Sequence, residues 1–439
     1  MMTAFEAFPK YEAYKDSGIE WLGSIPSDWN IKPGFIAYSE NKRNNKGLKE
    51  ETVLSLSYGN IIIKPKEKLV GLVPESFETY QIVEPGDIII RCMDLQNDKT
   101  SLRTGLAEND GIITSAYLNL KVNDNFSSEF IYYYLHSLDT TKILYKFGKG
   151  LRQNLSFLDF YRLPVFDISK SLQSTIVTFL DKKTSQIDEA IGIKQKQIEL
   201  LKERKQIFIQ KAVTQGLDPI VPMCDSGYEW LGEIPAHWKL LRVKNIFNLV
   251  MEPSEINNSH ELLSVYTDIG VKPRRELEER GNKASTTDGY WIVKKGDIVV
   301  NKLLAWMGAI GLSNYDGVTS PAYDILRPNR PIEGMFYHLL FRSSFCSTEL
   351  KKHSRGIMDM RLRLYFDRFG VIEVPYPPLE EQTKIISFIE RQFSKVDSLI
   401  DLQQSQIEKL KEYKTTLINS AVTGKIKVPE IQFNTKEAQ

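Results

Sequence analysis

The sequence has few cysteines, and they lie far apart. Cys92, Cys224 and Cys346 are separated by more than 100 residues and form no C-x-x-C pair. The five histidines show no spacing that is typical of zinc ligands. These patterns argue against a disulfide scaffold and against a zinc ribbon. Three scattered thiols fit a reducing cytosol, so we expect a cytoplasmic protein with no structural metal.

The sequence also has no long apolar run and no excess of one charge. No stretch reaches the roughly 18 consecutive apolar residues that a membrane helix needs, and the first residues do not resemble a secretory signal. The 57 basic residues are balanced by 56 acidic ones, which gives a formal net charge of +1. We therefore expect no membrane partner. A nucleic-acid surface would have to gather its basic residues locally or use the charge of a partner.

Motifs of several enzyme classes are missing as well. The sequence contains no G-x-x-x-x-G-K-[ST] loop for ATP, no G-x-G-x-x-G, and no Asn- or Asp-Pro-Pro-aromatic tetrad of adenine methyltransferases. Two E-x-K triplets, at Glu203–Lys205 and Glu412–Lys414, have the form of nuclease motifs. Such triplets recur by chance in charged sequence, and both fall in segments with helical spacing. We expect no catalytic centre, cofactor or metal in this chain.

What the sequence does contain is an internal duplication with a period of 209 residues. Asp16–Trp29 reads DSGIEWLGSIPSDW and returns at Asp225–Trp238 as DSGYEWLGEIPAHW, with 10 of 14 positions identical. Ile187–Thr214 matches Val396–Thr423 at 14 of 28 positions. A period this long indicates tandem domains, because solenoid repeats have periods of about 20–50 residues. Weaker matches join Val53–Leu56 with Leu262–Val265, Gly86–Ile90 with Gly296–Val300, and Thr114–Tyr117 with Thr319–Tyr323.

The two later matched segments have the spacing of long amphipathic helices. In both, the seam positions step alternately by four and three residues, which is the heptad pattern of a coiled coil with two polar interruptions. Prolines are absent from 171–217 and from 379–427, and Gly216 and Gly424 follow as helix stops. Either helix alone would suit a globular core, but the shared register favours pairing of the two. The chain path, with a whole domain before or after each helix, favours the antiparallel direction. The predicted seam is Ile187, Ile191, Ile198, Leu201, Phe208, Val396, Ile400, Ile407, Leu410 and Leu417.

The remaining segments mix short strands with short helices. Asp87–Ile90, Asp297–Val300 and Gly111–Val122 are rich in β-branched residues and are bounded by Gly, Pro or Asp, which predicts strands. Phe130–Leu138 and Met335–Phe345 have helical spacing. We therefore predict two α/β (mixed α+β) globular domains in a pseudo-two-fold tandem repeat, separated by two long α-helices that form an antiparallel coiled coil.

This organisation resembles the specificity subunit of Type I restriction–modification enzymes. The motif S-G-x-E-W-L-G-x-I-P-x-x-W, at Ser17–Trp29 and Ser226–Trp238, is similar to the start of each target-recognition domain in that family. Pro378–Gln382 (PLEEQ) resembles the usual start of the second helix, and Ala-Val-Thr recurs near both helix ends. The first helix begins with SKSLQ at Ser169–Gln173, which keeps the glutamine but lacks the proline. The resemblance covers nearly the whole chain. It predicts recognition domains at 1–168 and 217–375, conserved helices at 169–216 and 376–425, and a tail at 426–439.

The resemblance also implies a function. Each recognition domain would read one half of a split double-stranded DNA target, and the paired helices would set the unread gap. Two methyltransferase (modification) subunits would dock on the helices and use S-adenosylmethionine to methylate adenine N6. A restriction subunit, the motor-nuclease, would bring ATP and Mg chemistry. Two alternatives stay open: a DNA-modifying enzyme in its own right, and a structural scaffold whose helices only hold partners.

Local basic clusters provide candidate DNA contacts. Segment 142–152 carries four basic residues and no acid, and segment 351–368 carries six against two acids, at equivalent places in the two halves. Arginine can pair with guanine, and glutamine or asparagine with adenine. The alternative interpretation of each residue is a polar side chain on a solvent-exposed loop that does not contact DNA. The predicted DNA-binding residues are Lys146, Lys149, Arg152, Gln153, Asn154, Arg274, Arg275, Lys351, Lys352, Arg355, Arg361 and Arg363.

Four tryptophans recur in the two opening motifs, as Trp21 and Trp29 and again as Trp230 and Trp238. Indole rings can serve as stacking platforms for bases. Their recurrence in both halves favours packing inside a structural module instead.

Overall fold

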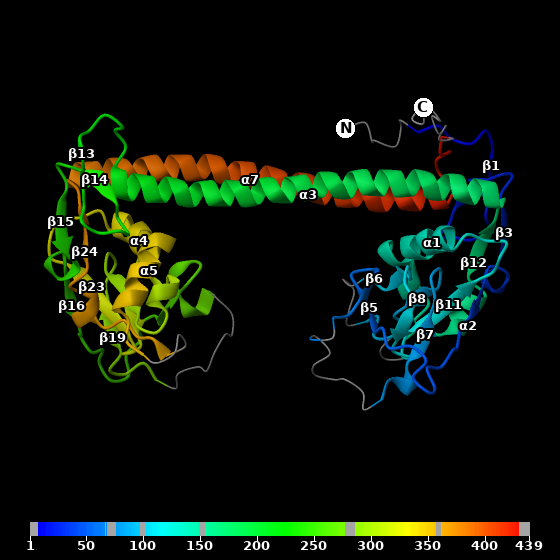
Figure 1. Ribbon diagram of the computed structural model, residues 1–439, viewed down its shortest axis with the longest axis horizontal. Helices are drawn as coiled ribbons and strands as arrows, with labels where there is room; N and C mark the ends of the chain where they lie inside the picture. Colours follow the sequence, from blue (N-terminus) through cyan, green and yellow to red (C-terminus); the bar gives the residue numbers. More distant parts are fainter. Residues whose placement is uncertain are drawn as a thin grey trace. The chain divides into compact units, whose positions relative to one another are not determined.

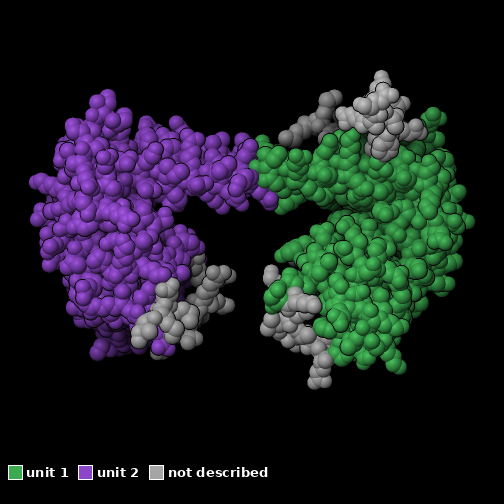
Figure 2. All heavy atoms as spheres, in the orientation of Figure 1, with its two compact units in different colours: residues 1–194, 405–439 green, residues 195–404 purple. Residues whose placement is uncertain are grey.

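A computed structural model of the protein describes residues 8–65, 67, 76–96, 102–148, 154–276, 286–356 and 361–429. The chain forms two compact units (Figure 2). The first unit combines residues 1–194 with residues 405–439, and the second consists of residues 195–404. The first unit is therefore built from both ends of the chain.

A four-stranded antiparallel sheet forms the centre of the first unit, in the order β4-β11-β8-β9. All three residues of β8 are buried, which explains the apolar sequence of this strand. Two-stranded antiparallel pairs join β1 with β2, β3 with β12, β5 with β6, and β7 with β10. The strands are β1 (Tyr14–Asp16), β2 (Ser24–Pro26), β3 (Asn30–Pro33), β4 (Tyr38–Glu40), β5 (Leu54–Ser57), β6 (Asn60–Ile63), β7 (Gln81–Val83), β8 (Ile88–Ile90), β9 (Thr104–Leu106), β10 (Gly111–Ile113), β11 (Leu118–Val122) and β12 (Pro164–Asp167). The short helices are η1 (Gly34–Ile36), η3 (Phe77–Thr79), α1 (Ser128–Thr140), η4 (Ile143–Lys146) and α2 (Phe157–Tyr161).

The second unit repeats this topology strand for strand. Its four-stranded sheet has the order β16-β23-β20-β21, and four two-stranded pairs accompany it. The strands are β13 (Met223–Asp225), β14 (Glu233–Pro235), β15 (Lys239–Arg242), β16 (Phe247–Val250), β17 (Leu263–Tyr266), β18 (Gly270–Pro273), β19 (Trp291–Val293), β20 (Ile298–Asn301), β21 (Ile310–Leu312), β22 (Gly317–Thr319), β23 (Tyr323–Pro328) and β24 (Glu373–Tyr376). The short helices are η5 (Val243–Asn245), η6 (Arg274–Glu276), η7 (Ala305–Met307), α4 (Gly334–Arg342), α5 (Ser344–His353) and α6 (Phe366–Phe369). The fold is mixed α+β, as the sequence predicts.

Two predicted elements need correction. The strand predicted over Gly111–Val122 is two strands, because a turn at Thr114–Tyr117 separates β10 from β11. The Gln81 side-chain amide holds that turn by donating to the Thr114 and Tyr117 carbonyl oxygens at 3.0 and 2.7 Å. The helix predicted over Met335–Phe345 is two helices, because Ser343 adopts extended backbone and its hydroxyl caps the start of α5. The periodicity of the apolar residues does not register either interruption.

In each unit, the aspartate of the repeated Gly-Asp pair is buried and forms an ion pair with an arginine. Asp87 is 3% exposed and accepts a 2.6 Å hydrogen bond from Arg43. Asp297 is 2% exposed and accepts two 3.0 Å bonds from the Arg327 guanidinium. A buried carboxylate needs such a partner, since an unpaired charge away from water is strongly unfavourable. The weak match at Gly86 and Gly296 therefore records a shared structural feature.

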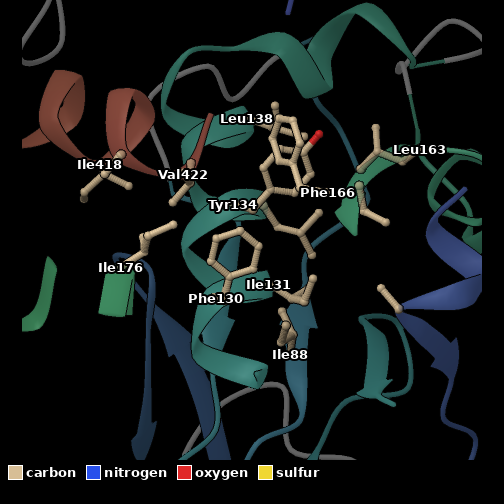
Figure 3. Close-up of a cluster of buried hydrophobic side chains, with 14 of the residues drawn as sticks. Ile88, Phe130, Ile131, Tyr134, Leu138, Leu163, Phe166, Ile176, Ile418 and Val422 are labelled. Atoms are coloured by element: carbon tan, nitrogen blue, oxygen red, sulfur yellow. The ribbon is translucent and has the colours of Figure 1, made fainter. Parts of the chain in front are cut away.

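Helix α1 lies at the centre of the core of the first unit. Its residues Phe130, Ile131 and Tyr134 are at most 1% exposed. Figure 3 shows them among side chains from the sheet and from both long helices, including Ile176 and Ile418. The globular part and the helical segments of this unit therefore share one hydrophobic core.

The two long helices are α3 (Lys170–Gln215) and α7 (Leu379–Val422), with 46 and 44 residues (Figure 1). In the first unit, Lys414 pairs with Asp188 at 2.6 Å. In the second, Lys205 pairs with Asp397 at 2.7 Å. Residue numbers thus rise along one helix as they fall along the other, so the pairing is antiparallel. The polar seam positions hold cross-helix contacts that specify register.

The predicted seam residues are only partly covered. Six of them are at most 8% exposed, and the other four are half-buried. Two helices alone cannot enclose every residue of an apolar stripe, because each seam has an open side. The buried six are Ile187, Ile198, Val396, Ile400, Ile407 and Leu417, and the half-buried four are Ile191, Leu201, Phe208 and Leu410.

Near the start of each long helix, a fully buried glutamine side chain forms hydrogen bonds with two backbone groups. The Gln382 side chain accepts from the Glu333 amide at 2.9 Å and donates to the Pro377 carbonyl at 2.9 Å. Gln173 accepts from the Ser127 amide at 2.8 Å and donates to the Ile168 carbonyl oxygen at 2.9 Å. The first helix therefore keeps this attachment although the proline of the motif is replaced.

Replacing Gln382 with alanine is expected to destabilise the protein by about 2–4 kcal/mol, since it leaves the half-buried Glu333 amide and the buried Pro377 carbonyl without this partner. Urea unfolding followed by circular dichroism measures this change. Gln404→Ala, on the exposed face of the same helix, is the matched control and should change stability by less than about 0.5 kcal/mol. Equal stability of the two variants would contradict the assigned role of Gln382.

The opening motifs pack against the helix ends. Trp29 and Trp238 are 1% and 5% exposed, so these rings belong to the cores and are not stacking platforms. In the first unit, a Cβ on Gly424 would lie 2.5 Å from Pro26. Gly424 also has a φ of 70°, which favours glycine, so the helix stop and the opening motif fit together only with glycine there.

Candidate nucleic-acid interface

In the second unit, Arg355 and Arg363 are brought together by backbone pairing. Each amide donates to the other residue's carbonyl oxygen at 2.9 Å, in an isolated antiparallel bridge. Both side chains are exposed, and Arg355 pairs with Asp367 at 3.1 Å. A Cβ on Gly356 would lie 2.6 Å from the Arg361 carbonyl oxygen, so glycine permits this close approach. Two predicted DNA contacts thus stand side by side on a supported backbone.

The end of α5 adds basic side chains before this bridge. Lys351 and Lys352 are exposed in the last turn, where cations also interact favourably with the helix dipole. Lys352 pairs with Glu349 at 3.2 Å. The Lys351 ammonium lies 4.8 Å from the centre of the Trp306 ring. Arg361 is exposed as well.

Each unit contains an equivalent backbone hydrogen bond between two of its own loops. The Leu364 amide donates to the Lys302 carbonyl oxygen at 2.8 Å, so the arginine bridge abuts the loop after β20. The Leu155 amide donates in the same way to the Cys92 carbonyl oxygen at 2.8 Å, after β8. Leu155 and Leu364, which directly follow the last predicted DNA contact of each basic cluster, therefore occupy the same place in the repeated fold.

The remaining predicted residues of the described ranges lie on other elements or loops. Lys146 ends η4, and the Asn154 side-chain oxygen accepts from the Asp94 amide at 2.8 Å. Arg274 and Arg275 lie on a separate element, η6, where Arg275 pairs with Glu261 at 3.0 Å. Lys149, Arg152 and Gln153 lie outside the described residues.

A residue that the sequence argument missed supports the loop of the first unit. Arg103 is fully buried, and its guanidinium donates to the carbonyl oxygens of Met93 and Asp94 at 2.6 and 3.1 Å. Its amide donates to Asp139, and burial raises the pKa of that carboxyl group. A single arginine in an irregular segment gives no periodic signal, so only the folded structure identifies this role.

Arg342 and His338 support the corresponding region of the second unit. The Arg342 guanidinium donates to the Gly308 carbonyl oxygen at 2.9 Å, and His338 Nδ1 accepts from the Leu312 amide at 3.0 Å. Burial lowers the pKa of His338 to about 4, and the nearby Arg342 acts in the same direction. His338 is therefore neutral near pH 7.

This shift predicts a loss of stability in acid. The unfolded chain binds the His338 proton near pH 6.5 and the folded chain only near pH 4. The contribution of neutral His338 to the free energy of unfolding is therefore fully present above about pH 6.5. The free energy of unfolding then falls by up to about 3 kcal/mol as the pH drops toward 4. His338→Asn keeps an acceptor without the titration, so urea unfolding at several pH values should show a weaker acid dependence. His260→Asn, at an exposed histidine, is the control. Identical pH profiles of wild type and His338→Asn would refute this assignment.

Within the described ranges, no group of three or more His, Cys, Asp or Glu side chains could hold a metal ion. No described helix is both long enough and apolar enough to cross a membrane.

Comparison with known proteins finds similarity to Type I specificity subunits. Residues 235–412 match the Type I restriction modification DNA specificity domain. Over 97% of its length, the chain is 22% identical to the whole of a putative type I restriction enzyme MjaX specificity subunit from Methanocaldococcus jannaschii. The chain is also 24% identical to the EcoBI specificity subunit of Escherichia coli, over 92% of this chain and 86% of the other. The chain is thus similar to Type I specificity subunits over nearly its whole length.

Solved structures share the fold of this chain. A chain from a study of assembly and conformational transition of the type I R-M system superposes with a TM-score of 0.60 at 15% identity. That match covers 91% of this chain and 98% of the other. The HsdS subunit from Thermoanaerobacter tengcongensis gives a TM-score of 0.51 at 14% identity, over 94% and 100% of the two chains. The mixed α+β domains with two long helices are therefore a fold that the chain shares with these structures.

Proposed function

We propose that this chain is a Type I specificity subunit that reads a split double-stranded DNA target, one half through each globular domain. The observation that carries the proposal is the repeated fold, in which the residue that follows an unlike group of predicted DNA contacts bonds to the loop after β8 in one unit and to the loop after β20 in the other. Identical readers would recognise a repeated sequence, whereas unlike readers recognise two different halves. Phosphate contacts would supply most of the affinity, and contacts to base edges the discrimination.

The proposed domain boundaries follow the sequence repeat. Residues 1–168 and 217–375 are the two recognition domains, 169–216 and 376–425 are the conserved helical segments, and 426–439 is the tail. We assign the twelve basic and amide residues predicted from the sequence to the DNA-facing surface. Arg355 and Arg363 are the strongest candidates, because the arrangement of their backbone presents both guanidinium groups to solvent.

The paired helices would set the unread gap and dock two methyltransferase subunits. Leu200, Ile207, Leu399 and Leu402 of the second unit are between 46% and 52% exposed on these helices. Apolar side chains in such numbers on a polar helix pair are typical of a surface that a partner covers. The partner would supply S-adenosylmethionine and adenine N6 methylation, and a restriction subunit would supply ATP and Mg chemistry. This chain would contribute specificity and no catalysis.

Methylome sequencing tests the proposal. Cells that carry the gene and its methyltransferase should show a split motif with N6-methyladenine in both halves. The motif should disappear when only the gene of this chain is deleted. A scaffold without DNA contacts predicts instead that purified complex binds duplexes weakly and without the steep salt dependence of phosphate contacts. Methylation of the same motif without this chain would refute the proposal.

A further inference from the structure

The loop after β20 exposes apolar side chains beside the arginine bridge. Leu303, Leu304 and Met307 are 38%, 40% and 52% exposed. We call these three residues the apolar tip. Single exposed apolar residues are common on protein surfaces, but a contiguous group marks a surface that binds something.

Hydrogen bonds hold the apolar tip in one shape. The Leu303 amide donates to the Asn301 side-chain oxygen at 3.1 Å. The amides of Met307 and Ala309 both donate to the Leu304 carbonyl oxygen, at 2.9 and 3.0 Å. A loop that is already ordered loses little conformational freedom on binding, so its contacts contribute more fully to affinity.

Cationic groups border the apolar tip. The Lys351 ammonium lies over the ring of Trp306, which directly precedes Met307. The Leu364 amide is bonded to the Lys302 carbonyl oxygen, which places the exposed Arg363 next to the same loop. An apolar centre with a cationic border fits an anionic partner that also presents an apolar group.

Double-stranded DNA has this combination of groups. Its phosphates are anionic, and the major-groove edge of each A·T pair presents the 5-methyl group of thymine. We propose that the apolar tip reads a thymine 5-methyl group in the half-site bound by the second unit. This inference rests on the proposed function and names one determinant of its specificity.

The first unit differs at the equivalent loop. Cys92 and Lys302 are equivalent, because each carbonyl oxygen accepts the corresponding backbone hydrogen bond in its unit. Met93 and Asp94 therefore stand where the second unit has Leu303 and Leu304. Met93 is 41% exposed, and the buried Arg103 holds the backbone of this loop. A carboxylate repels phosphates and cannot contact a methyl group as leucine does. The methyl reading therefore belongs to the second unit.

Uracil substitution is the direct test, because uracil lacks only the 5-methyl group of thymine. The full chain, in complex with its methyltransferase, is titrated with DNA duplexes that contain the target motif identified by methylome sequencing. In each duplex, one thymine of the motif is replaced by uracil. For the wild type, at least one replacement should weaken binding about fourfold, which is the effect of one buried methyl-sized group. The variant L303A/L304A/M307A should bind the thymine and uracil duplexes equally at that position.

Two control variants isolate the apolar tip. Ile220→Ala removes an 87% exposed apolar side chain elsewhere in the second unit and should keep the fourfold difference. Met93→Ala, in the first unit, should also keep it. Met307→Ala alone serves as a second tip variant if the triple substitution disturbs folding, which thermal unfolding reports.

The outcomes separate this inference from the proposed function. If the wild-type complex binds its target selectively but uracil has no effect, or has the same effect in the tip variants, the apolar tip does not read thymine. The proposed function would then stand without it. If the wild-type complex binds the split target no better than an unrelated duplex, both proposals are wrong.

Discussion

Replacing Arg355 and Arg363 together with glutamine is expected to weaken binding of the methyltransferase complex to its target about 100-fold or more. Each arginine that pairs with a base or phosphate contributes about 1–3 kcal/mol, and the two side chains lie on one backbone bridge. In the free chain, Asp367 pairs with Arg355 at 3.1 Å, and that ion pair is solvated. DNA binding would therefore exchange one anionic partner for another at little cost.

Fluorescence anisotropy with a labelled target duplex at several salt concentrations measures this effect. The double variant should also lower the slope of log affinity against log salt by up to about two, if both side chains contact phosphates. Arg242→Gln is the control, because Arg242 is 52% exposed and pairs with Glu373, and it is not part of the arginine bridge. A loss of less than about threefold in the double variant would remove this bridge from the interface.

Deleting one heptad from each long helix is expected to shorten the unread gap of the target. Residues 192–198 of α3 and 403–409 of α7 are matched segments, since Asp188 pairs with Lys414 and Lys205 with Asp397 on either side of them. Removing seven residues shortens a helix by about 10 Å and changes its rotation by only about 20°. That length corresponds to about three base pairs. The sequences of both half-sites should stay the same, because neither reader is altered.

Methylome sequencing of cells that carry the shortened chain measures the gap directly. Deleting 192–198 alone is the control: the lengths of the two helices then no longer match, the Lys205 or Lys414 pair is lost, and methylation should drop. An unchanged gap in the double deletion would show that the helices do not set it.

The long helices were predictable because their information is local. Helical spacing, the missing prolines and the terminal glycines all act within one segment, and α3 and α7 begin and end close to the predicted residues. The pairing was also predictable from the matching polar interruptions, and its antiparallel direction from the chain path, which has a whole domain before or after each helix. Lys205 and Lys414 indeed pair with acids on the other helix.

Other features required contacts between distant segments. The turn that divides Gly111–Val122 depends on the amide of Gln81, which lies more than 30 residues away. The buried Arg103 depends on carbonyl groups that only the folded loop gathers together. No pattern of neighbouring residues carries this information.

The sequence by itself determined the duplication, the helical pair, the family resemblance and the basic composition of the candidate interface. Only the tertiary structure decided which charges stand together, through the bridge of Arg355 with Arg363, and that Leu303, Leu304 and Met307 lie exposed beside them. The physical reason is the range of the interactions. Periodicity and helix stops arise from neighbours along the chain, whereas a binding surface is assembled from loops that meet only after their strands have paired.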